Sequence, residues 1–118
     1  MPAVALISDL MMQSQVSGAA ARAGVSLEIS GSADELLTKV ESAQPRLVIL
    51  DLSHPRIDPG QLVPRLKLTL PPGATVLAFG PHVHKELLSA AESAGCELVI
   101  SRGQFHAQME ELLKRFAS

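Results

Sequence analysis

The feature that most constrains this chain is an unbroken apolar run at residues 47–50 that ends in an aspartate. Leu52 follows Asp51, and the chain then becomes rich in proline and glycine. A continuous apolar run is typical of a central strand in a parallel sheet, which helices cover on both faces. An ionised carboxylate inside such a strand costs several kcal/mol unless it is paired. We therefore expect Asp51 at the carboxyl end of the strand, facing a crevice that is open to solvent.

The rest of the chain divides into alternating strands and helices. Apolar runs predict further strands at residues 3–8, 25–29, 75–79 and 97–101. Helical spacing of apolar residues predicts helices at residues 12–23, 32–43, 62–70, 85–94 and 105–116. Pro64 is expected to shorten or bend the third of these helices. Right-handed crossovers then give an α/β fold, a doubly wound five-stranded parallel sheet in a (βα)5 three-layer sandwich, as one domain over residues 1–118.

Composition and charge exclude several classes of function. The net charge is −2 and the aromatic residues are three Phe with no Trp or Tyr, so nothing favours binding to nucleic acid. No apolar stretch approaches the roughly 20 residues that cross a bilayer. The N-terminus lacks the positive segment of a signal peptide. The single cysteine, Cys96, excludes an internal disulfide and fits a reducing compartment, so we expect a soluble, cytoplasmic protein without membrane contact.

The residues that follow each strand should share one edge of the sheet, where open α/β folds bind ligands. This rim is expected to contain Ser8, Asp9, Asp51, Ser53, Gly80, His82 and Arg102. Two carboxylates from different strands repel each other, and Mg²⁺ suits them because it takes carboxylates, a backbone carbonyl, waters and a phosphate. The candidate metal ligands are Asp9, Asp51 and Ser53. Because Arg102 can hold a phosphoryl oxygen, the set indicates phosphoryl transfer onto Asp51.

Residues after Asp51 follow a recognisable spacing: three residues, Pro55, two residues, Asp58, and Gly60 one place later than the pattern expects. With this motif the whole chain resembles the receiver domain of response regulators in two-component signalling, a family with a flavodoxin-like fold. The resemblance implies that Asp51 is the phosphoacceptor and that a histidine kinase or another signalling protein is the partner. Further similar positions are Ser8–Asp9 for the family's acidic pair, Gly95–Cys96–Glu97 for its Gly-Ala-Asp motif, and Arg102, Gly103 and Phe105 for its Lys-Pro-Phe motif.

Four positions depart from the pattern of that family. Ser8 removes one acidic group from the pair, although the residue that resembles the direct metal ligand remains. Gly80 stands where the family has a hydroxyl residue that bonds the phosphoryl oxygen and draws the next loop inward. Arg102 replaces the lysine, and Val99 replaces the switch aromatic. The chain therefore resembles a degenerate pseudo-receiver, in which Asp51 can accept phosphate but the usual response is broken.

The leading hypothesis is a stand-alone signalling module that acts by protein contacts. In one version a kinase phosphorylates Asp51 with Mg²⁺ held by Asp9 and Asp51. In the other, which the degenerate positions favour, the module binds partners or forms a homodimer through its last two helices. An alternative from another class is a small metal-assisted hydrolase that uses the same carboxylates with His54 or His82. A zinc site at His82 and His84 is not expected, because no further ligand lies at suitable spacing.

Each candidate also has a plain structural role. Asp51 can cap its own turn, and Asp9 can be the carboxylate at the start of a helix, where it interacts favourably with the helix dipole. Asp58 before Pro59 is most simply an N-cap. Arg102 can be an ordinary surface arginine. The structure must decide between these roles and the functional ones.

Overall fold

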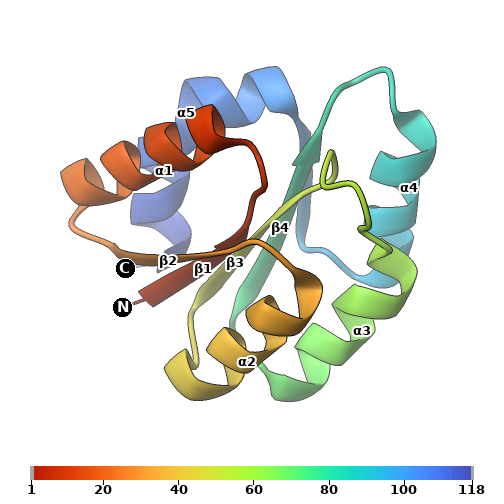
Figure 1. Ribbon diagram of the computed structural model, residues 1–118, viewed down its shortest axis with the longest axis horizontal. Helices are drawn as coiled ribbons and strands as arrows, with labels where there is room; N and C mark the ends of the chain where they lie inside the picture. Colours follow the sequence, from red (N-terminus) through yellow and green to blue (C-terminus); the bar gives the residue numbers. More distant parts are fainter. Residues whose placement is uncertain (1, 118) are drawn as a thin grey trace.

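Five parallel strands form one sheet in the order β2-β1-β3-β4-β5, and helices cover both of its faces (Figure 1). The computed structural model describes residues 2–117. Its strands are β1 (Pro2–Leu6), β2 (Ser26–Ser30), β3 (Leu47–Asp51), β4 (Thr75–Gly80) and β5 (Leu98–Ser101). Its helices are α1 (Leu10–Ala23), α2 (Ala33–Ala43), α3 (Pro59–Thr69), α4 (Lys85–Ala94) and α5 (Arg102–Ala117). The predicted doubly wound α/β fold is confirmed.

Local signals in the sequence set several helix ends. α1 ends at Gly24, whose φ of 71° is a left-handed conformation that glycine adopts without strain. At the start of α2, the Ser32 hydroxyl accepts a hydrogen bond from the Glu35 amide at 3.2 Å. Pro64 does not end α3, which continues to Thr69, and the alternative expectation of a bend at Pro64 stays a prediction. Because proline lacks one amide, it removes a single intrahelical hydrogen bond there.

The two faces of the sheet bury separate apolar clusters. Alternate residues of β1 point to opposite faces, so Ala5 packs with residues of α1 and α5, whereas Leu6 packs with residues of α2, α3 and α4. On the first face, the rings of Phe79 and Phe105 stack with their centroids 4.1 Å apart and their planes 3° apart. This stack joins the end of β4 to the first turns of α5.

The edges of the sheet are β2 and β5, and the edge position of β2 agrees with its alternating sequence. β1 ends at Leu6 rather than at Ser8, so Ser8 and Asp9 lie in the connection that leads into α1. Among the described residues, no helix combines the length and the apolar character that a membrane crossing demands.

Candidate functional site

Four of the predicted rim positions lie at the carboxyl edge of the sheet. Asp9 follows β1, Asp51 ends β3, Gly80 ends β4, and Arg102 begins α5 directly after β5. These strands are neighbours in the order β1-β3-β4-β5. Because all strands run in the same direction, their carboxyl ends meet at one edge, and the topology brings the four positions together as the sequence predicts.

Asp51 is buried, with 1% of its surface exposed. Its Oδ1 accepts a hydrogen bond from the Ser53 backbone N–H at 2.8 Å, which closes the turn after β3. Burial raises the pKa of the Asp51 carboxyl, whereas the Ser53 N–H and the charge of Arg102 act in the opposite direction. The prediction that Asp51 faces a crevice open to solvent is wrong, because the residue is buried. Asp51 is still part of β3 and pairs with Phe79 of β4.

Asp9 is the N-cap of α1. Its Oδ1 accepts hydrogen bonds from the backbone N–H groups of Met11 at 2.9 Å and of Met12 at 3.4 Å. The pKa of the Asp9 carboxyl is lowered mainly by the hydrogen bonds from the backbone N–H groups of Met12 and Met11, and Arg102 lowers it further. The structural role considered for Asp9 is therefore present, and one carboxylate oxygen is used for it.

Arg102 pairs with the other carboxylate oxygen of Asp9. A guanidinium nitrogen of Arg102 lies 2.9 Å from Asp9 Oδ2, although the two residues are 93 positions apart in the sequence. Both side chains are partly exposed, at 38% for Arg102 and 43% for Asp9. Arg102 is therefore not an isolated surface arginine, and its charge is directed at the rim.

A pocket of about 400 Å³ opens beside this ion pair, between the first turns of α1 and α5. The residues that line it are Asp9, Met11, Met12, Gln15, Arg102, Gly103 and His106. Asp51 is not among them. Solvent therefore has access to the Asp9–Arg102 pair, whereas Asp51 is buried and does not line this pocket.

Gly80 is buried at the end of β4, and Leu52 occupies the space beside it. A Cβ added to Gly80 would lie 3.1 Å from Leu52 Cβ and 3.6 Å from Leu52 Cδ1. Leu52 is itself fixed, because its backbone N–H donates to the Phe79 carbonyl at 2.8 Å and its side chain is 1% exposed. The backbone at residue 80 is therefore in close contact with Leu52, a residue that sequence reasoning did not connect with the site.

Solved structures are similar to the chain over nearly its whole length, whereas no protein-family model and no curated protein matches its sequence. A response regulator receiver domain from Bermanella marisrubri matches with a TM-score of 0.82 at 16% identity, over 98% of this chain and 96% of that chain. The receiver domain of NtrX from Brucella abortus matches with a TM-score of 0.79 at 21% identity, over 98% and 96%. This chain has the receiver-domain fold.

A third receiver domain, from a sensor histidine kinase of Pseudomonas aeruginosa, matches with a TM-score of 0.80 at 11% identity. The match covers 98% of this chain and 95% of that domain, which is described with a magnesium ion coordinated in its active-site cleft. A longer NtrX structure from Brucella abortus contains the same fold in 26% of its chain. At these identities the likeness concerns the fold.

On this receiver fold, the rim side chains do not fit a resident Mg²⁺ as they stand. Mg²⁺ needs free oxygen ligands and room for several waters. Both oxygens of Asp9 are engaged, one by backbone N–H groups and one by Arg102. Asp51 is buried, and its Oδ1 is bonded to Ser53. Among residues 2–117, no three His, Cys, Asp or Glu side chains gather closely enough to hold a metal ion.

Two further predicted positions lie apart from the ion pair. Ser53 has an exposed side chain and contributes its backbone N–H to the Asp51 turn. Val99 is part of β5 and packs, partly buried, against the apolar cluster on the α2, α3 and α4 side of the sheet. The Ser53 side chain also bonds the Asp51 carboxyl and lowers its pKa, so Ser53 acts on the rim through Asp51. The metal-ligand role of Ser53 and the switch role of Val99 stay predictions from the sequence and the resemblance.

His54 links two loops instead of serving as a free base. Its Nε2 lies 2.6 Å from the Gly31 carbonyl, and its Nδ1 accepts the Arg56 backbone N–H at 3.4 Å. Since a carbonyl only accepts, Nε2 carries the proton and both ring nitrogens are used. His82 is exposed in the loop after β4. Asp58 is the N-cap residue of α3, as predicted, but its side chain makes no capping hydrogen bond.

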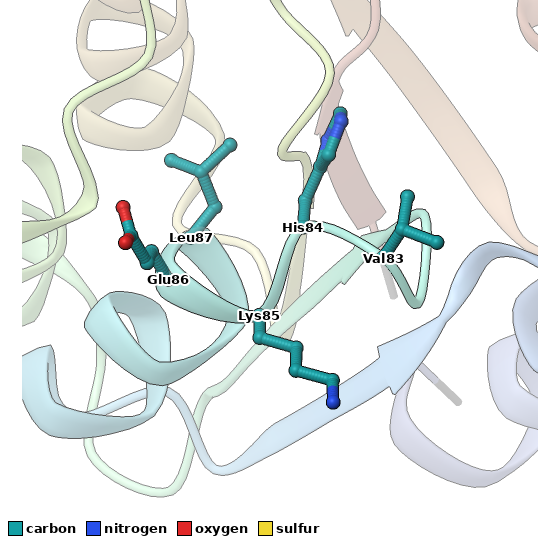
Figure 2. A pocket seen from close by; sticks show the side chains of 5 residues that line it. All are labelled: Val83, His84, Lys85, Glu86 and Leu87. Atoms are coloured by element: carbon teal, nitrogen blue, oxygen red, sulfur yellow. The ribbon is translucent and has the colours of Figure 1, made fainter.

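A second pocket, of about 420 Å³, lies at the start of α4 (Figure 2). Val83, His84, Lys85, Glu86 and Leu87 line it. Figure 2 shows the Lys85 side chain extending away from those of His84 and Val83. Polar groups do not converge in this pocket, so it offers no arrangement for catalysis.

Proposed function

We propose that this chain is a receiver-type signalling module that acts through protein contacts without a phosphorylation-driven movement at the end of β4. The observation that carries the proposal is the close contact between Gly80 and Leu52, at 3.1 Å for an added Cβ. The receiver resemblance places at residue 80 a hydroxyl that bonds the phosphoryl oxygen. Gly80 has no side chain to carry a hydroxyl, and a Cβ at this position would already be in tight contact with Leu52 Cβ at 3.1 Å. The loop after β4 therefore lacks the group that would pull it toward Asp51.

In this proposal, Asp51 keeps the phosphoacceptor position but has lost its effect on the rest of the molecule. Its carboxyl ends β3 as the resemblance requires, yet it is 1% exposed. Mg²⁺ binding at Asp9 and Asp51 would first require Arg102 to leave Asp9. The hydrolase alternative is not favoured, because His54 uses both ring nitrogens in backbone contacts.

The contact surface in this proposal is formed by α4, β5 and α5. β5 is an edge strand, and every one of its residues is only partly buried. A shallow groove between α4 and α5 crosses it, lined by Lys85, Leu88, Ser89, Glu92, Val99, Ile100, Ser101 and Gln104. A partly apolar strand at the edge of a sheet suits a protein partner, either a histidine kinase, another signalling protein or a second copy of the chain. The single-domain organisation and the cytoplasmic location stay predictions.

The experiment adds a phosphoryl analogue or a phosphoryl donor and measures the NMR chemical shifts of the backbone amides. The full chain and the Asp51→Asn variant are treated with Mg²⁺ and beryllofluoride, or with acetyl phosphate, and followed by intact mass and two-dimensional NMR. We expect no Asp51-dependent shift at Gly80, in α4 or in β5, and equal self-association of the two proteins. An adduct that is lost in Asp51→Asn and that shifts amides of α4 and β5 contradicts the proposal.

A separate assay addresses the hydrolase alternative. The chain is incubated with a generic phosphoester, with and without a metal chelator, and product is measured over time. We expect no turnover above the uncatalysed rate. Turnover that the chelator abolishes would instead support a metal-assisted hydrolase at the rim.

A further inference from the structure

The rim contains a fixed positive charge within hydrogen-bonding distance of one of its two carboxylates. Arg102 lies 2.9 Å from Asp9 Oδ2, and its charge also acts on Asp51, where it favours the ionised form. A guanidinium remains protonated at every ordinary pH. The two carboxylates at the rim are therefore partly neutralised by a cation that belongs to the chain itself.

The carboxylate half of this ion pair is held in place by α1. Asp9 Oδ1 is bonded to the Met11 and Met12 amides at the first turn of that helix. The positive end of the helix dipole favours the same charge. The orientation that satisfies these amides also directs Oδ2 at Arg102, so the pair and the helix cap support each other.

The cationic half is held in place by the start of α5. Ser101 and Gln104 cap each other at this helix end. The Gln104 backbone N–H donates to Ser101 Oγ at 3.1 Å, and the Ser101 backbone N–H donates to Gln104 Oε1 at 3.0 Å. One residue later, Phe105 stacks on Phe79 of β4. The backbone of Arg102, which lies between these contacts, is thereby fixed, and the guanidinium reaches Asp9 from a rigid helix end.

From these contacts we propose that the Arg102 guanidinium is the built-in cation of the rim, and that it takes the place of a divalent metal ion. The inference rests on the proposed function, since it describes why the same site works without a metal-dependent switch. Asp9 and Arg102 line the same pocket, so a divalent cation that reaches Asp9 through this pocket also comes close to the guanidinium of Arg102. Because the two positive charges repel each other, metal binding requires that the Asp9–Arg102 ion pair opens.

The test measures Mg²⁺ binding to the full chain by NMR titration at constant ionic strength. Three proteins are compared: the wild type, Arg102→Met, and Arg65→Met, which removes one exposed arginine of α3 as a control for net charge. We expect no saturable shift in the wild type or in Arg65→Met. In Arg102→Met we expect saturable shifts centred on residues 9 and 51, at Mg²⁺ concentrations roughly tenfold or more below those at which the wild type shows any shift.

Two outcomes overturn the inference. The first is a wild type that binds Mg²⁺ at the amides of residues 9 and 51 as tightly as Arg102→Met. The second is an Arg102→Met variant that folds but gains no affinity. If Arg102→Met does not fold, the wild-type titration and an Arg102→Lys variant decide: both keep the positive charge, so saturable Mg²⁺ binding by either at residue 9 contradicts the inference. The beryllofluoride response at Gly80 is a separate measurement, so this inference and the proposed function can fail independently.

Discussion

At the scale of single residues, Asp51 places a charge where the protein excludes water. Burial raises the pKa of its carboxyl, so the folded state favours the protonated form. The stability that the group contributes is fully present below its unfolded pKa and is lost as pH rises through the higher folded pKa. At neutral pH, the ionised Asp51 therefore makes the folded state less stable than it would be with a neutral side chain.

The substitution Asp51→Asn tests this cost. Asn has the same shape, and its side-chain oxygen can still accept the Ser53 N–H. We expect the variant to be more stable at pH 7 by about 0.5–2 kcal/mol, the range that single stabilising substitutions commonly reach. The gain should shrink as the pH falls through the raised pKa of the wild-type carboxyl, because the protonated carboxyl is uncharged like the Asn side chain. Urea unfolding followed by circular dichroism measures both values, since the chain has no Trp or Tyr for fluorescence. A stability gain of Asp51→Asn that becomes larger at acidic pH would contradict a cost from burying the Asp51 charge.

A second residue-scale prediction concerns the contact between Gly80 and Leu52. In Gly80→Ser, the new Cβ lies 3.1 Å from Leu52 Cβ, so we expect a loss of about 1–3 kcal/mol in the free energy of unfolding. Combining Gly80→Ser with Leu52→Gly, which removes the Leu52 Cβ, should restore part of that loss, giving a favourable coupling energy in a double-mutant cycle. Gly103→Ser is the matched control, because the nearest atom to its added Cβ is 4.0 Å away. Additive effects of the two substitutions would refute the steric explanation.

At the scale of elements, His54 connects the loop after β3 to the loop after β2. The bond from Nε2 to the Gly31 carbonyl spans 2.6 Å and joins segments that the sheet alone does not link, because β1 lies between β2 and β3. The loop that His54 holds is the one that follows Asp51. The position of that loop therefore depends on a contact with the loop after β2, a strand that is not next to β3 in the sheet.

Removing this link should loosen both loops. We expect His54→Ala to lower the free energy of unfolding by about 1 kcal/mol, the usual value of one hydrogen bond. Amide exchange should become faster at residues 31–33 and 52–57. His82→Ala, which removes an exposed histidine of the loop after β4, serves as the control and should leave both quantities unchanged. Equal effects of the two substitutions would show that His54 is not a specific link.

The elements themselves were predictable because their signals are local. α4 begins at Lys85 and ends at Ala94 as its apolar spacing predicts, and Gly24 ends α1 for a steric reason that one residue determines. β3 was predictable from its apolar run, but the burial of Asp51 was not. Whether a strand end is open depends on how the next turn folds, and the sequence pattern contains no information on that.

The contacts within the site were less predictable, because their partners are distant in the sequence. Arg102 and Asp9 are 93 residues apart, and His54 and Gly31 are 23 apart. Alternating strands and helices predict that strand ends share an edge, which brought Asp9 and Arg102 into one list of candidates. They do not predict which side chains pair, since that depends on reach and rotamer. The contact of Leu52 with Gly80 had no signal at all, because an apolar residue beside a glycine is ordinary.

At the scale of the whole molecule, burial is unevenly distributed across the sheet. α4 buries only Ala91, and β5 has no fully buried residue, whereas all five residues of β3 are buried. α5 buries five residues along one face. Regions with few buried apolar contacts open at lower free energy than the core. We therefore expect the α4–β5 side to open at lower free energy than the centre of the sheet.

Hydrogen exchange measures this difference directly. We expect amides of α4 and β5 to exchange faster than those of β1, β3 and α5 under native conditions, because local opening exposes them without global unfolding. The comparison is made residue by residue by NMR at one pH and temperature. Uniform protection across all five strands would show instead that the fold opens only as one unit.

The stack of Phe79 on Phe105 has a practical consequence for studying this molecule. Two parallel rings with centroids 4.1 Å apart lie next to Gly80 on one strand and close to Arg102 on one helix. Ring currents displace the resonances of protons above and below them, and the chain has only one other phenylalanine and no other large aromatic side chain to obscure the signal. The molecule therefore carries an intrinsic spectroscopic reporter at the junction of β4 and α5, which requires no label or added dye.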